Sequence, residues 1–168
     1  MKAAPREFDV IVLGATGFTG ALVAEYLIDR YGVGDVLRWA AAGRNEQKLA
    51  TLRESLGSRA QSLPLIVADT LDAASMRQLA ERARVVLTTV GPYARYGSEV
   101  VAACAESGTH YCDLAGEVQW IRRMIGAHND TARRSGARIV HCCGFDSIPM
   151  DIGAWFLQNE ANQRYGAY

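Results

Sequence analysis

The sequence lacks a net charge, a long apolar run and the cysteine spacing of a metal site. Its 18 lysine and arginine residues balance 18 aspartate and glutamate residues, which leaves no basic field for binding nucleic acid. No apolar run reaches the roughly 18–20 residues that a membrane-spanning helix needs. The four cysteines form no Cys-x-x-Cys pair and the three histidines have no zinc-finger spacing. We therefore expect no bound metal, and reduced thiols in a cytoplasmic protein without a secretory signal.

What is present is a chain of 168 residues, 49% hydrophobic and 21% charged, which excludes a disordered tail and fits one globular domain. Segments typical of strands and helices alternate along it. The expected strands are 8–13, 37–42, 63–68, 84–90, 109–113 and 138–141, and the expected helices are 21–31, 46–56, 71–83, 99–106, 118–134 and 148–158. This alternation predicts an α/β fold, a doubly wound parallel sheet with helices on both faces.

The segment GATGFTG connects the first expected strand to the first expected helix. A residue without Cβ permits the tight turn at Gly14, the approach of a pyrophosphate to the backbone at Gly17, and close helix–strand packing at Gly20. Backbone N–H groups at the start of the helix, aided by its dipole, then bind the negative phosphates. The alternative is a glycine-rich turn without a ligand. The candidate pyrophosphate-binding residues are Gly14, Thr16, Gly17, Phe18, Thr19 and Gly20.

The ends of the next strands supply the other candidate cofactor contacts. NAD-specific domains commonly end the second strand with an acidic residue that binds the ribose 2′-hydroxyl. Arg44 stands there instead, and its planar guanidinium suits the 2′-phosphate of NADP(H), unless it is merely a solvated charge at the start of a helix. Asp69, after the third strand, either binds the adenine amino group or makes a turn. Gly91 and Pro92, after the fourth strand, lie where the far half of a dinucleotide would pass.

The sequence identifies no catalytic residue, and it offers three candidates. A nicotinamide cofactor supplies the hydride, so the protein must position a substrate and manage one proton. Tyr93, Asp113 and Asp146 follow the fourth, fifth and sixth expected strands, although each could instead pack or cap a helix. The Tyr-x-x-x-Lys pair of short-chain dehydrogenases is missing, because the only lysines are Lys2 and Lys48.

Four segments have the order and content of one known family: GATGFTG (14–20), TTVGPYARYG (88–97), GTHYCDLAGE (108–117) and CGFDSIPMD (143–151). Together they resemble the saccharopine dehydrogenase-like oxidoreductases, and most of all the trans-acting enoyl reductases of actinobacterial lipid synthesis. The resemblance implies a Rossmann-type NADP(H)-binding domain over residues 1–147. Residues 148–168 would begin the connection to a second domain, for substrate and subunit contacts, that this chain lacks. By position, Asp113 and the turn 144–149 would match the cleft floor.

The resemblance implies hydride transfer from NADPH to a C=C bond of a small-molecule or carrier-linked lipid substrate. Two other functions stay open. One is a saccharopine reductase-type enzyme that reduces a C=N bond in an amino-acid-like substrate. The other is a non-catalytic NADP-sensing module, which the absent second domain and the missing Tyr-x-x-x-Lys pair favour. A homodimer, and a peripheral membrane association through the absent part, also stay open.

Overall fold

The computed structural model describes residues 5–34 and 36–166. These residues form a six-stranded sheet in the order β3-β2-β1-β4-β5-β6, with every neighbouring pair parallel. This is the strand order of the doubly wound dinucleotide-binding fold, so the predicted fold class is confirmed. The strands are β1 (Phe8–Leu13), β2 (Trp39–Gly43), β3 (Leu65–Val67), β4 (Ala83–Thr88), β5 (His110–Cys112) and β6 (Ile139–Val140).

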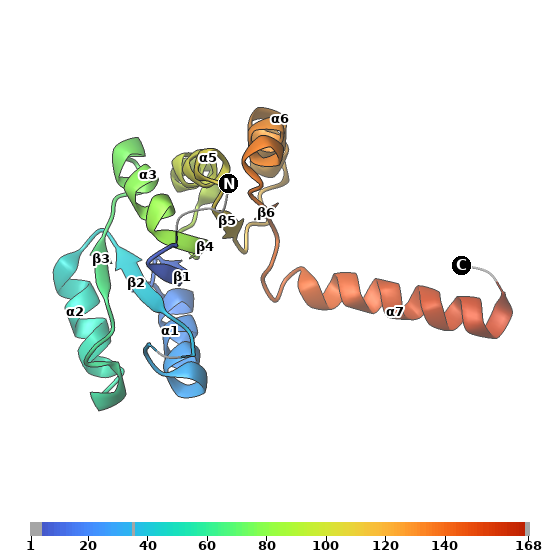
Figure 1. Ribbon diagram of the computed structural model, residues 1–168. Coiled ribbons are helices and arrows are strands. Elements are labelled where there is room, and N and C mark those ends of the chain that lie inside the picture. The colour runs from blue at the N-terminus through green and yellow to red at the C-terminus, as the bar shows by residue number, and fades with distance from the viewer. Residues whose placement is uncertain (1–4, 35, 167–168) are drawn as a thin grey trace.

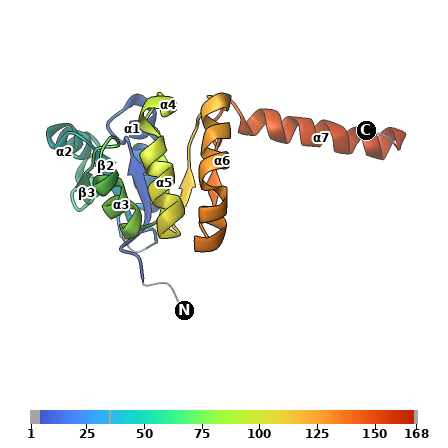
Figure 2. The same ribbon diagram turned by 90° about the horizontal axis from the view of Figure 1, so that it is seen from above.

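Helices cover both faces of this sheet (Figure 1). One group packs on one face and a second group on the other, while the last helix leaves the body of the domain, as Figure 2 also shows. The first group is α1 (Phe18–Tyr31) and α2 (Glu46–Ser55), and the second is α3 (Ala73–Arg82), α5 (Ser98–Ser107) and α6 (Val118–Ser135). The remaining helices are the 3₁₀ turn η1 (Ser58–Ala60), the short α4 (Tyr93–Tyr96) and the projecting α7 (Ile148–Tyr165).

The alternation of side chains along β1 divides the core into two layers. Ile11 and Leu13 point into the cluster with α3, α5 and α6, whereas Val12 points into the cluster with α1 and α2. All three side chains are almost completely buried. A strand covered on both faces therefore appears in the sequence as a continuous apolar run rather than as an alternating one.

Two helix boundaries differ from the sequence-based expectation by three residues or more, and the others by at most two. Helix α1 begins at Phe18, earlier than predicted, because the last residues of the glycine segment already form its first turn. Helix α7 continues to Tyr165 rather than ending at Gln158. Asp72, at the start of the expected helix 71–83, caps α3, since its Oδ1 accepts the N–H of Ala74 at 2.9 Å.

Helix α7 has no buried residue and extends away from the sheet (Figures 1 and 2). Its large apolar side chains are exposed, with Trp155 at 65% and Leu157 at 67% of their full accessibility. Within residues 5–34 and 36–166, no helix combines the length and apolar character that a bilayer crossing requires.

Candidate functional site

The candidate site lies where the strand order reverses, between β1 and β4. From this point the chain leaves β1 towards one face of the sheet and β4 towards the other, which opens a crevice at the carboxyl ends of the strands. A hollow of about 440 Å³ occupies this position and is lined by the loops after β1, β2, β3 and β4. It brings together six of the predicted cofactor residues: Gly14, Thr16, Gly17, Arg44, Gly91 and Pro92.

The turn after β1 requires glycine at two positions. Gly14 has φ +88°, and a Cβ there would lie 2.6 Å from Cγ2 of Val90, so both the backbone and the space exclude a side chain. A Cβ on Gly20 would lie 2.1 Å from the Gly14 carbonyl oxygen, so α1 could not pack this close to β1. The Thr89 hydroxyl donates to that same oxygen at 3.2 Å and joins the two loops of the crevice.

Gly17 differs from these two glycines, because nothing in the protein demands that it be glycine. Its φ is −81°, and a Cβ on it would meet only the Gly14 carbonyl oxygen, at 3.4 Å. The backbone of Gly17 is exposed and lines the hollow. A missing side chain at such a position leaves room for a ligand against the backbone, as a pyrophosphate requires.

The N-terminus of α1 also lacks the side-chain cap that the neighbouring helices have. Asn45 Oδ1 accepts the N–H of Lys48 at 2.9 Å at the start of α2, and Asp72 caps α3 in the same way. No side chain caps α1 at Gly17, and its first turn carries no acidic residue. The first N–H groups of a helix have no partner within it, so those of α1 are free to bind phosphate oxygens. The residues present thus fit a dinucleotide.

Arg44 and Asp69 follow the neighbouring strands β2 and β3. Arg44 is exposed and lines the crevice, in the place where an NAD-specific domain would carry an acid. Asp69 was expected either to bind adenine or to make a turn. It makes a turn, because its Oδ1 accepts the N–H of Leu71 at 3.0 Å. It does not line the hollow, whereas its buried neighbour Thr70 does. Adenine binding by Asp69 stays a prediction.

Tyr93 is a packing residue in this structure. Its hydroxyl donates to the Thr88 carbonyl at 3.1 Å and accepts the N–H of Leu114 at 3.3 Å, and its ring lies against Trp120. Burial raises the pKa of the phenol to about 12. The hydroxyl therefore faces the protein rather than a substrate.

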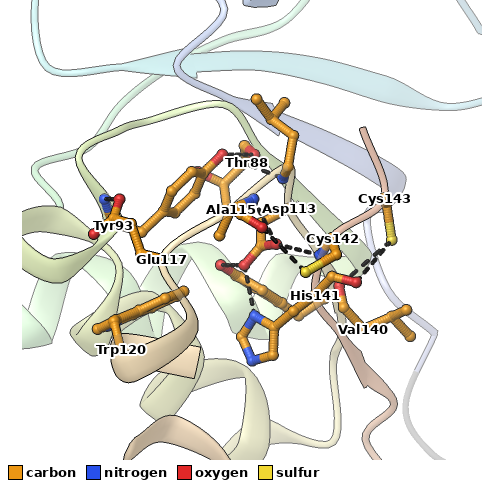
Figure 3. Close-up of polar contacts among 12 residues, drawn as sticks. Thr88, Tyr93, Asp113, Ala115, Glu117, Trp120, Val140, His141, Cys142 and Cys143 are labelled. Atoms are coloured by element: carbon orange, nitrogen blue, oxygen red, sulfur yellow. Dashed lines mark hydrogen bonds and ion pairs between the residues drawn. The ribbon is translucent and has the colours of Figure 1, made fainter. Parts of the chain in front are cut away.

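Asp113 is the centre of a buried hydrogen-bond network (Figure 3). Its Oδ2 accepts the Tyr111 hydroxyl at 2.7 Å and lies 2.6 Å from Nδ1 of His141. Its Oδ1 accepts the N–H groups of Ala115 and Cys142 at 3.1 and 3.0 Å. Burial alone would raise the pKa of this carboxyl, but the hydrogen bonds from His141, Tyr111 and Ala115 outweigh it and leave the pKa below its usual value.

This network fixes the loops after β5 and β6 to each other. The carbonyl oxygen of Asp113 also accepts the N–H of Cys143 at 2.7 Å, and Cys142 takes the left-handed φ of +61°. Asp146 lies further along, exposed, in a turn where Ser147 N–H donates to the Gly144 carbonyl. The structure does not bring Asp146 into the crevice lining.

The structure adds further residues to the site. The carboxylate of Glu117, which follows β5, accepts the N–H groups of Tyr93 and Ala94 at 2.6 and 2.7 Å and so caps α4. Gly43 and Thr89 line the crevice beside the predicted residues. Their places at the ends of β2 and β4 are the signal that could have indicated them.

Comparison with known proteins supports this geometry. Residues 10–140 match the family described as the saccharopine dehydrogenase NADP-binding domain. A Mycobacterium tuberculosis protein is 50% identical over 163 residues, which are 97% of this chain and 38% of that protein. A Mycobacterium ulcerans protein named trans-acting enoyl reductase is 47% identical over 161 residues, 96% of this chain and 38% of its own length. The chain thus spans well under half of these relatives.

Solved structures show the same fold. Saccharopine dehydrogenase (L-Glu forming) from Saccharomyces cerevisiae superposes with a TM-score of 0.73 at 19% identity, covering 93% of this chain and 32% of that one. The NAD(P)-binding domain of an exopolyphosphatase-related protein from Archaeoglobus fulgidus has a TM-score of 0.55 at 14% identity, covering 92% of this chain and 98% of that one. The match over residues 10–140 therefore shows that the chain belongs to the family of saccharopine dehydrogenase NADP-binding domains.

Proposed function

We propose that the chain is the cofactor-binding part of an NADPH-dependent enoyl reductase in lipid biosynthesis, acting on a C=C bond of a small or carrier-linked lipid substrate. The observation that carries cofactor binding is the crevice between β1 and β4, with an uncapped α1 and Arg44 in place of an acid. The relatives named trans-acting enoyl reductase support the choice of reaction.

Each residue of the crevice receives a role in this proposal. The backbone N–H groups of Thr16, Phe18 and Thr19 bind the pyrophosphate beside the bare backbone of Gly17, whose own N–H donates to the Gly14 carbonyl at 3.0 Å. Gly14 and Gly20 give the loop its shape. Arg44 binds the 2′-phosphate, Asp69 the adenine amino group, and Gly91 and Pro92 flank the nicotinamide half. Bound NADPH supplies the hydride, while the chain orients it and excludes water from one side.

Tyr93 and Asp113 act as positioning residues rather than as proton donors. Both side chains are buried and occupied by hydrogen bonds within the protein. They hold the loops after β4, β5 and β6, and Asp146 lies on the turn that follows. Proton transfer to the substrate would then come from another part of the enzyme.

We propose a division of the chain at residue 147, with α7 as the start of a connection to a substrate and dimerisation domain. The exposed apolar side chains of α7 support this division, because a helix with apolar residues on several sides is normally buried. We also propose a cytoplasmic location, a homodimer formed through that second domain, and peripheral membrane contact through the same domain.

A non-catalytic NADP sensor is the second candidate, favoured by the buried hydroxyl of Tyr93 and the fully bonded carboxylate of Asp113. A steady-state NADPH oxidation assay, with enoyl thioesters and with imines, separates the candidates when the chain is joined to the remaining part of a relative such as the Mycobacterium ulcerans protein. Turnover of enoyl thioesters supports the reductase, turnover of imines alone indicates the C=N reductase, and cofactor binding without turnover supports the sensor.

A further inference from the structure

We propose that Lys48 is a second cation for the 2′-phosphate of NADP(H), acting with Arg44 and with the hydroxyl group of Thr16. This inference rests on the proposed function, because it assumes that the crevice binds a dinucleotide. It adds a specificity-determining residue on α2, the one lysine among residues 5–34 and 36–166.

Two hollows meet at Thr16. The dinucleotide crevice is lined by Thr16, Gly43 and Arg44, and a neighbouring hollow of about 310 Å³ is lined by Thr16, Lys48 and the following turns of α2. A Cβ built on Gly43 would lie only 3.7 Å from the Thr16 hydroxyl oxygen, so the glycine loop is close to the end of β2. Arg44 and Lys48 therefore line two hollows that share Thr16.

The first turn of α2 fixes the place of Lys48. Its N–H donates to Asn45 Oδ1, so Lys48 lies at the end of the helix nearest the crevice. Thr51 and Ser55 share its side of α2 and line the same hollow. Their hydroxyl groups donate to carbonyl groups of their own helix, at 3.0 and 2.7 Å. The ammonium group of Lys48 is thus the cationic donor at this end of the hollow.

Neither Arg44 nor Lys48 forms an ion pair with another described residue, whereas Arg38, Arg59 and Arg82 all do. Glu46 is the one acid between them in sequence, and residues two apart on a helix do not face each other. A phosphate monoester carries close to two negative charges at neutral pH, so two cations match it better than one. The 2′-hydroxyl of NADH is uncharged, so it gives a lysine at this position no anion to bind.

The test is a titration of the chain with NADPH and NADH, followed by nicotinamide fluorescence, with 2′-AMP and 5′-AMP as smaller probes. Lys48→Gln is expected to weaken the binding of NADPH and of 2′-AMP on the order of tenfold, because it removes one charge-assisted hydrogen bond. NADH and 5′-AMP should change by less than about twofold, since they lack that phosphate. Lys48→Arg should restore most of the affinity for NADPH.

Arg53→Gln is the matched control. It removes one positive charge from the same helix, but Arg53 lines a different hollow, so NADPH affinity should stay close to that of the wild type. Equal weakening of NADPH and NADH by Lys48→Gln, or equal effects of Lys48→Gln and Arg53→Gln on NADPH, would overturn the assignment. A wild-type chain that prefers NADPH while Lys48→Gln changes nothing refutes this inference alone. A folded wild-type chain that binds neither nucleotide refutes the proposed function together with it.

Discussion

Replacement of Asp113 tests whether its network holds the carboxyl edge of the sheet. Asp113→Ala leaves four groups without their acceptor: the Tyr111 hydroxyl, Nδ1 of His141 and the N–H groups of Ala115 and Cys142. Each unpaired buried group costs about 1–3 kcal/mol, but these costs do not add, and loss of one partner of a buried pair typically costs about 3–5 kcal/mol. We expect a loss of about 3–5 kcal/mol in the free energy of unfolding, a large share of the roughly 5–15 kcal/mol of a typical domain.

Asp113→Asn is the conservative partner of this variant. Its amide oxygen can still accept the N–H groups of Ala115 and Cys142, and its amide N–H groups can donate to Tyr111 and His141. We therefore expect it to lose only about 1–2 kcal/mol. Urea denaturation of the wild type and both variants at neutral pH measures the three values. A free energy of unfolding for Asp113→Ala that lies within about 0.5 kcal/mol of the wild-type value would refute the reasoning, because that is the range of a neutral surface substitution.

The same carboxylate makes stability depend on acid pH. Its pKa is lower in the folded chain than in the unfolded chain, so its contribution is present above the unfolded value of 3.8 and is lost as pH falls through the folded value. The difference in stability between the wild type and Asp113→Asn should therefore shrink below about pH 4. Denaturation curves at a series of acid pH values measure this difference, and a gap that stays constant would contradict the assigned shift.

Three further variants test the crevice. Gly20→Ala should destabilise the chain by about 1–3 kcal/mol or more, because its Cβ would lie 2.1 Å from the Gly14 carbonyl oxygen, and thermal denaturation measures this. Gly17→Ala should keep stability within about 1 kcal/mol yet abolish NADPH binding in a fluorescence titration, and binding that survives would remove the pyrophosphate role. Tyr93→Phe should lose about 1 kcal/mol and leave NADPH affinity unchanged, whereas lost affinity would place its hydroxyl at the ligand.

The parts of the fold that depend on local sequence could be predicted. The limits of β1 agree with the apolar run 8–13, and the cap at Asp72 agrees with its position before α3. Helix α4 was not predicted, because its N-terminal N–H groups are capped by Glu117, which is distant in sequence. Periodicity within a window cannot show such a contact.

In the candidate site, too, the features that depend on neighbouring residues could be predicted and those that depend on distant residues could not. The glycine loop and Arg44 were predictable because a strand, a turn and a helix follow one another there in sequence. The roles of Tyr93 and Asp113 depend on Trp120 and His141, which lie 27 and 28 residues further along the chain. From sequence alone each of these two side chains was compatible with a cleft or with the core.

The central claim is that the crevice between β1 and β4 binds NADP(H) with a preference set by the 2′-phosphate. Titration of the purified 168-residue chain with NADPH and with NADH, for the wild type and for Arg44→Ala, tests it most directly. The account predicts tighter binding of NADPH by the wild type, and a loss of about tenfold or more in Arg44→Ala for NADPH but not for NADH. Equal weakening of both nucleotides, or no binding of either by the folded wild type, would contradict it.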